Sequence, residues 1–171
     1  MRSLDDLLDL LLPAHDSFVT FGSQNGKIVG PRAAGLWSGL AADCIVVIAI
    51  SKSGQKGCWH CYSHESDETL RENVTEQIKQ CFPHDETHLY YFGGRSDSGE
   101  IERSMHVVSL LDTELAEYPS AKRHLHQPYT QDIYATRDGE VQAFITSGGP
   151  SVFHDQVDIN AALPMRGCRE K

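Results

Sequence analysis

The segment from Cys44 to Ile50, with the sequence CIVVIAI, constrains the fold more than any other part of the chain. Its seven residues are all apolar and most of them are β-branched, which favours an extended strand over a helix. Because successive side chains of a strand point to opposite faces, both faces of this strand are apolar and both have to be covered. We therefore predict a layered structure built around one buried strand.

Neighbouring segments predict further strands. Ser51–Gln55 predicts a hairpin turn, after which Lys56–Ser63 returns as the partner strand. Asp138-Gly139 is typical of a second tight hairpin turn. Short apolar or alternating segments predict the remaining strands, at residues 17–21, 27–29, 88–92, 132–135 and 141–146.

The spacing of apolar residues also predicts about three helices. The first follows Ser3 and ends at Pro13, and the second begins at Asp67. The third follows Asp97 and Glu100, which resemble a capping box. The apolar stripes of the second and third helices are Leu70, Val74, Ile78 and Cys81, and Ile101, Met105, Val108 and Leu115.

The predicted fold class is α+β: a layered α/β sandwich of mixed, mostly hairpin-connected strands with about three helices. A chain of 171 residues has room for one such domain, which we place at residues 1–150. The periodicity fades beyond this point, so residues 151–171 are predicted to be a C-terminal tail.

Charge and cysteine content restrict the classes of partner and the compartment. The chain has 15 Lys and Arg against 24 Asp and Glu, a net charge of −9, so neither nucleic acid nor a membrane is an expected partner. Five cysteines are an odd and sparse set, which favours a reducing compartment over a disulfide framework. The acidic N-terminus does not resemble a signal peptide, and we expect a cytoplasmic protein where it is synthesised. Secretion into a host or target cell by a signal-independent route is compatible with the same residues.

The reactive side chains concentrate around two strands, and the first interpretation concerns the CxxC motif of Cys58 and Cys61. Two cysteines at this spacing can hold zinc or form a redox disulfide. However, the segment is predicted to be a strand, in which residues three apart point to opposite faces. A zinc or redox protein using Cys58 and Cys61 therefore remains an alternative.

The second interpretation pairs Cys44 with a histidine of the returning strand. A turn centred on Lys52 places His60 opposite Cys44, and a turn centred on Gly54 places His64 there. A centre at Ser53 brings Tyr62 opposite instead. A neighbouring imidazole accepts the thiol proton and makes cysteine a nucleophile, so either histidine is a candidate base.

The motifs around this pair resemble the Cys–His protein glutamine deamidases. The resemblance rests on GLWSGLAADC at residues 35–44, on GCWH at 57–60 and on LYYFGG at 89–94, within roughly residues 30–146. This superfamily includes the chemoreceptor deamidase CheD and the catalytic domains of cytotoxic necrotizing factor-type toxins. Ser38, Cys44 and His60 match its Ser or Thr, its cysteine and its histidine.

The resemblance implies a catalytic domain that converts a protein glutamine to glutamate with release of ammonia, or transfers it to an amine. Cys44 would be the nucleophile, His60 the base with His64 as the alternative, and Ser38 the group that orients the imidazole. Its partner would be a protein bearing a reactive glutamine, and no cofactor or metal is required. A non-catalytic binding module on the same fold is a second alternative.

Other residues of these motifs are expected to form the pocket. Backbone N–H groups from Gly39 and Leu40 to Cys44 would hold the oxyanion. Trp37 and Trp59 either wall the pocket or belong to the core. Asp43 stands where the family usually has a small residue, and strand alternation predicts that it points away from the thiol.

Overall fold

The computed structural model describes residues 26–31, 35–136, 138–146, 165 and 166. The strands are β1 (Lys27–Val29), β2 (Gly35–Ala41), β3 (Ile45–Ser51), β4 (Lys56–Cys61), β5 (Thr87–Gly93), β6 (Ser120–Leu125), β7 (Thr130–Thr136), β8 (Glu140–Thr146) and β9 (Met165–Arg166). The helical segments are α2 (Asp67–Leu70), the π-helical η3 (Arg71–Thr75), α3 (Glu76–Cys81) and α4 (Ile101–Glu114).

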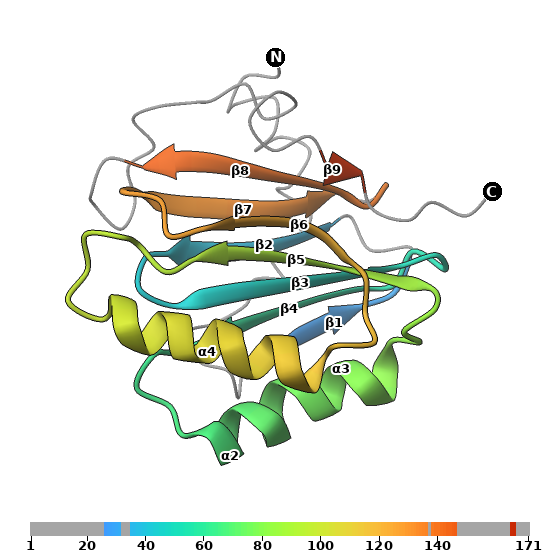
Figure 1. Cartoon of the computed structure of the whole chain (residues 1–171). Coiled ribbons are helices and arrows are strands. Elements are labelled where there is room, and N and C mark those ends of the chain that lie inside the picture. Colours follow the sequence, from blue (N-terminus) through green and yellow to red (C-terminus); the bar gives the residue numbers. More distant parts are fainter. Residues whose placement is uncertain (1–25, 32–34, 137, 147–164, 167–171) are drawn as a thin grey trace.

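These elements form three layers (Figure 1). A five-stranded sheet with the order β1-β4-β3-β5-β6 lies in the middle, and a four-stranded sheet with the order β2-β7-β8-β9 covers one of its faces. The segments α2, η3, α3 and α4 cover the other face. All pairings are antiparallel except that of β5 with β6, which α4 connects as a crossover. The α+β class and the layered arrangement are confirmed.

The central strand is β3, as its sequence predicted. It pairs with β4 on one side and β5 on the other, and all seven of its residues are buried. Val46, Ile48 and Ile50 belong to the core between the two sheets, and the odd-numbered residues up to Ala49 belong to the core beneath the helices. A polar residue on either face of β3 would therefore be buried in one of the two cores.

The second predicted helix is present as α2, η3 and α3 in direct succession. Ser66 caps it, because the Ser66 hydroxyl accepts a hydrogen bond from the backbone N–H of Thr69. The residues predicted to face the core are buried except the last, Cys81, which is exposed.

The details predicted for the third helix are partly wrong, although Leu115 is buried in the core beneath the helices and Val108 packs against that core, as predicted. Its N-cap is Glu100, without a side-chain cap, so Asp97 and Glu100 do not form a capping box. The helix α4 buries Ser104, Val107, Leu110 and Leu111, whereas Met105 is 56% exposed. Periodicity placed the apolar stripe about one residue out of register, because several apolar residues lie on neighbouring stripes of this helix.

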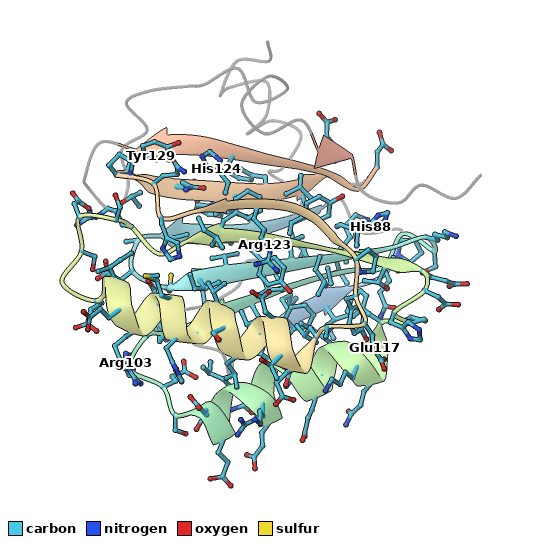
Figure 2. All side chains as sticks on the ribbon, viewed as in Figure 1. His88, Arg103, Glu117, Arg123, His124 and Tyr129 are labelled. Atoms are coloured by element: carbon cyan, nitrogen blue, oxygen red, sulfur yellow. The ribbon has the colours of Figure 1, made fainter. Side chains whose placement is uncertain are left out.

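Two strands within the predicted domain were not predicted. The strand β2 is rich in glycine and small residues, and it is extended because it pairs with β7. The strand β6 is polar, and it is extended because it pairs with β5 after the α4 crossover. Arg123 of β6 lies over the Tyr91 ring and bonds to Asp112 of α4 (Figure 2). Neither strand has the apolar alternation that identifies a strand locally.

Some predictions fall on parts of the chain outside the described residues. These are the helix after Ser3, the strand at residues 17–21 and most of the tail at 151–171. Within the predicted tail, Met165 and Arg166 form β9 and pair with Val141 and Glu140. No helix in the described part of the chain is long and apolar enough to span a membrane.

Candidate functional site

The candidate site lies at the end of the five-stranded sheet where β3 begins and β4 and β5 end. Cys44 is the last residue of the bend at 42–44 that leads into β3, and His60 is the penultimate residue of β4. The register pairs Val46 with His60, which centres the turn on Ser53. Of the three turns considered from the sequence, this is the one that places neither histidine directly opposite Cys44.

Cys44 nevertheless contacts His60. The Cys44 Sγ atom lies 3.2 Å from His60 Nδ1, and the contact is buried. His60 is the diagonal neighbour on the same face, and diagonal pairs lie within reach of long or aromatic side chains. The other candidate base, His64, is exposed and stacks on Tyr62. The structure therefore brings together Cys44 and His60.

A bulge in β2 supplies the third group of the site. The register of β2 against β7 shifts between Trp37 and Leu40, and Gly39 adopts a positive φ of 70° there. The Ser38 hydroxyl is used within the bulge: it donates to the Gly39 carbonyl and accepts from the Ile133 backbone N–H. The Ser38 carbonyl contacts His60 Nε2. Ser38 thus contacts the imidazole through its backbone and not through its hydroxyl.

These two contacts determine the tautomer of His60. A carbonyl oxygen can only accept a hydrogen bond, so Nε2 carries the proton and donates it to Ser38. The unprotonated Nδ1 then faces the Cys44 thiol with its lone pair. The imidazole is therefore held in the orientation and tautomer that a base acting on this thiol requires.

Burial keeps both partners uncharged. It raises the pKa of the Cys44 thiol to about 12, although hydrogen bonds to the sulfur from the backbone amides of Ala42 and Cys44 act to lower this pKa. Burial also lowers the pKa of His60, although the hydrogen bond to the Ser38 carbonyl acts to raise it. Burial therefore favours a thiol and a neutral imidazole over a thiolate and an imidazolium.

Asp43 has a smaller effect than its position beside the cysteine suggests. It lies in the bend and not in the strand, so the alternation argument that pointed it away from the thiol does not apply. Two influences raise the Cys44 pKa, burial and the negative charge of Asp43. The Asp43 charge is the smallest of all the influences on this pKa. Asp43 Oδ1 is buried and has no hydrogen-bond partner among the described residues.

The Gly93-Gly94 pair at the end of β5 closes over the backbone of the Cys44 bend. The Gly94 N–H donates to the Cys44 carbonyl at 3.0 Å, and the Arg95 N–H donates to Ala42 at 2.9 Å. Both glycines have positive φ, and a Cβ atom at Gly93 would overlap the Cys44 carbonyl oxygen. The pair is required because only glycine lets the two segments approach this closely.

The two cysteines of the CxxC motif point to opposite faces of β4, as strand alternation predicted. Cys58 packs in the core between the sheets, and Cys61 packs in the core beneath the helices. Two sulfurs on opposite faces cannot approach one ion or form a disulfide with each other. Among the described residues no cluster of three or more His, Cys, Asp or Glu side chains is suited to a metal. This placement argues against the zinc or redox alternative.

The two tryptophans lie away from the thiol, so their assignment as pocket walls is corrected. Trp59 is on the helix-facing side of β4, where it packs edge-on against Phe82 and donates to Gln77. Trp37 stacks on Tyr134 and donates to Asp132, on the face of the small sheet that points away from the core. Strand alternation places both residues on the faces opposite to those that form the site.

Two further residues were not singled out from the sequence, and only the first of them, Tyr62, lies near the site. Tyr62 was mentioned only as an alternative neighbour of Cys44, and it lies on the His60 face of β4. Asp132 is 2% exposed. Burial raises its pKa to about 6, although the hydrogen bond from Trp37 acts to lower it. Leu40 pairs with Asp132 in the ladder between β2 and β7. The sequence signal for Asp132 would have been a carboxylate within a predicted strand.

Comparison of the chain with protein-family models finds no match, and comparison with curated proteins finds none. The assignment of a function therefore depends on the geometry of Cys44, His60 and Ser38.

Proposed function

We propose that the chain is a cysteine hydrolase that deamidates glutamine side chains of a protein partner. One observation carries the proposal: the Cys44 thiol lies 3.2 Å from His60 Nδ1, and the Ser38 carbonyl holds the other ring nitrogen. A thiol, a base within hydrogen-bonding distance and a group that orients the base are the elements that nucleophilic catalysis needs. The motifs that resemble the Cys–His deamidases supply the type of substrate.

The first step transfers the thiol proton to His60 as the sulfur attacks. The S–H bond of Cys44 breaks, its proton goes to Nδ1, and the sulfur bonds to the carboxamide carbon of the glutamine. Because both partners are neutral at rest, proton transfer accompanies the attack. The negative oxygen of the tetrahedral intermediate would be stabilised by backbone amides beside the sulfur, for which Ala42 and Cys44, whose amides hydrogen-bond to the thiol, are the candidates.

The second step releases the products. The proton on Nδ1 passes to the leaving nitrogen as the carbon–nitrogen bond breaks, which yields ammonia and a thioester on Cys44. His60 then accepts a proton from water, and the resulting hydroxide attacks the thioester carbon. The carbon–sulfur bond breaks, and His60 returns its proton to the Cys44 sulfur, which regenerates the thiol. The product is a glutamate, and an amine in place of water would give the transglutamination product.

The proposal is tested by ammonia release from a blocked glutaminyl-glycine dipeptide and from casein. Each mole of ammonia should match a mass gain of one dalton in the product. Cys44→Ser and His60→Ala should each lower the rate by about a thousandfold, in line with the loss of a member of a catalytic triad. Cys81→Ser is the matched control, because Cys81 is an exposed thiol on α3 and should leave the rate unchanged.

The same variants give a test that needs no substrate. Iodoacetamide should alkylate Cys44 in the wild type in a His60-dependent manner, while the fully buried Cys58 and Cys61 stay unmodified. Alkylation of Cys44 at the same rate in His60→Ala, together with no ammonia from either substrate, would contradict the proposal.

A further inference from the structure

A row of three rings leads from the candidate site to the surface. His60 belongs to β4, Tyr62 follows the end of this strand, and His64 lies in the turn after it. The ring centroids of His60 and Tyr62 are 6.5 Å apart, and those of Tyr62 and His64 are 5.1 Å apart at 29°. His60 is fully buried, Tyr62 is half-buried and His64 is exposed, so the row runs from the interior outwards.

Tyr62 lies close to Cys44. The ladder between β3 and β4 ends with the pair Ile45 and Cys61, and Cys44 and Tyr62 are the residues directly outside this last pair. Tyr62 also packs against the core cluster that contains Cys44. Its pKa is raised by burial and then by negative charge on Cys44, which is consistent with this proximity.

The thiol itself is almost covered. Cys44 is 6% exposed, although the bend residues before it are partly exposed. A substrate carbon has to come within bonding distance of the sulfur. The half-buried ring of Tyr62 lies close to Cys44, between the buried His60 and the exposed His64. The ring of Tyr62 contacts the rings on either side of it, so its position is restricted.

We propose that Tyr62 is the specificity-determining residue of the Cys44 site, and that its ring admits a narrow planar group at the end of a flexible side chain. This assignment of a substrate class rests on the proposed function, whereas the restriction of access rests on the geometry alone. A primary carboxamide meets the requirement, and a branched or aromatic group at the same position would collide with the ring.

The test compares two thiol reagents of different width on the intact protein. Iodoacetamide carries a planar primary carboxamide, and N-phenylmaleimide carries a bulky aromatic ring. The rate of Cys44 modification by each reagent is read by peptide mass spectrometry. Tyr62→Ala should raise the ratio of the maleimide rate to the iodoacetamide rate about tenfold, which corresponds to roughly 1.4 kcal/mol of steric discrimination. Tyr62→Phe keeps the ring and should retain the wild-type ratio.

Tyr129→Ala is the matched control. Tyr129 is also a half-buried tyrosine beside a histidine, with its hydroxyl 2.7 Å from His124 Nε2, and the two are labelled side by side in Figure 2. It lies just before β7 and should leave the ratio unchanged. An unchanged ratio in Tyr62→Ala, or an equal rise in Tyr129→Ala, would overturn the assignment.

A second variant covers the case in which Tyr62→Ala loosens the fold, which modification of Cys58 and Cys61 would reveal. Tyr62→Trp enlarges the ring and should lower the ratio of the two rates below that of the wild type. A ratio that does not fall would count against the proposal. Failure of the proposed function gives a different result, because the alkylation rates still depend on Tyr62 while no substrate releases ammonia.

Discussion

At the scale of single residues, the site combines two groups whose charged forms are disfavoured by burial. Cys44 and His60 are both neutral at rest, and His60 is held between the thiol and the Ser38 carbonyl. Burial of this kind makes the stability of the fold depend on pH, because the unfolded chain exposes the same groups to water.

The pKa of His60 predicts a loss of stability in acid. The unfolded chain takes up the proton at the usual histidine pKa of about 6.5, whereas folded His60 takes it up only at lower pH. Protonation therefore favours the unfolded state, and the contribution is lost as the pH falls below about 6.5. Urea unfolding at a series of pH values should show the wild type losing up to about 1.4 kcal/mol per pH unit more than His60→Gln in this range. Parallel curves for the two proteins would show that burial of His60 has no such effect.

At the scale of elements, the site depends on two irregular backbones that meet at Cys44. The bulge in β2 directs the Ser38 carbonyl toward the imidazole, and the backbone N–H groups of Gly94 and Arg95, just after β5, donate to the bend before β3. Strands of regular geometry would keep these backbone groups in their ladders. The positions of Cys44 and His60 are therefore determined by where the ladders are interrupted.

Gly93→Ala should disturb this arrangement directly. Gly93 has a φ of 97°, and the added Cβ would overlap the Cys44 carbonyl oxygen, so strain and displacement should cost about 3 kcal/mol of unfolding free energy. The displaced bend should also slow iodoacetamide modification of Cys44. The control is Gly99→Ala, whose Cβ would meet no atom within 4 Å and which should change stability by less than about 0.5 kcal/mol. Equal effects of the two substitutions would contradict this account of Gly93.

At the scale of the whole molecule, two cores share one strand. The side chains of β3 alternate between the core under the helices and the core between the sheets. A chain whose two cores share their central strand cannot lose one of them without exposing one face of that strand to water. The three described layers are therefore expected to unfold together.

The two tryptophans allow this cooperativity to be measured. Trp59 reports on the helical layer and Trp37 on the small sheet, so Trp37→Phe and Trp59→Phe each leave one probe. In urea, the fluorescence midpoint of each variant should coincide with its own far-UV circular dichroism midpoint. Distinct midpoints for the two probes in one variant would mean that the layers unfold separately.

Local patterns in the sequence determined much of this description. The β-branched run placed β3 at the centre, and alternation placed Cys58 and Cys61 on opposite faces and His60 on the same side as Cys44. These features follow from the two-residue period of a strand, which can be recognised within one short segment of the sequence. Only pairing with distant segments made β2 and β6 strands, because their own residues carry no alternation.

The register and the bulge were decided by tertiary structure. A shift of the turn by one residue moves the partner of Cys44 by two, from His60 to Tyr62 to His64, and all three keep the same face. No local property of Ser51–Gln55 was used to distinguish these turns, and the structure has the register that pairs Val46 with His60. The carbonyl that orients His60 lies 22 residues away in sequence and on the other sheet. The sequence by itself determined which residues share a face, and the contacts between layers decided which of them touch.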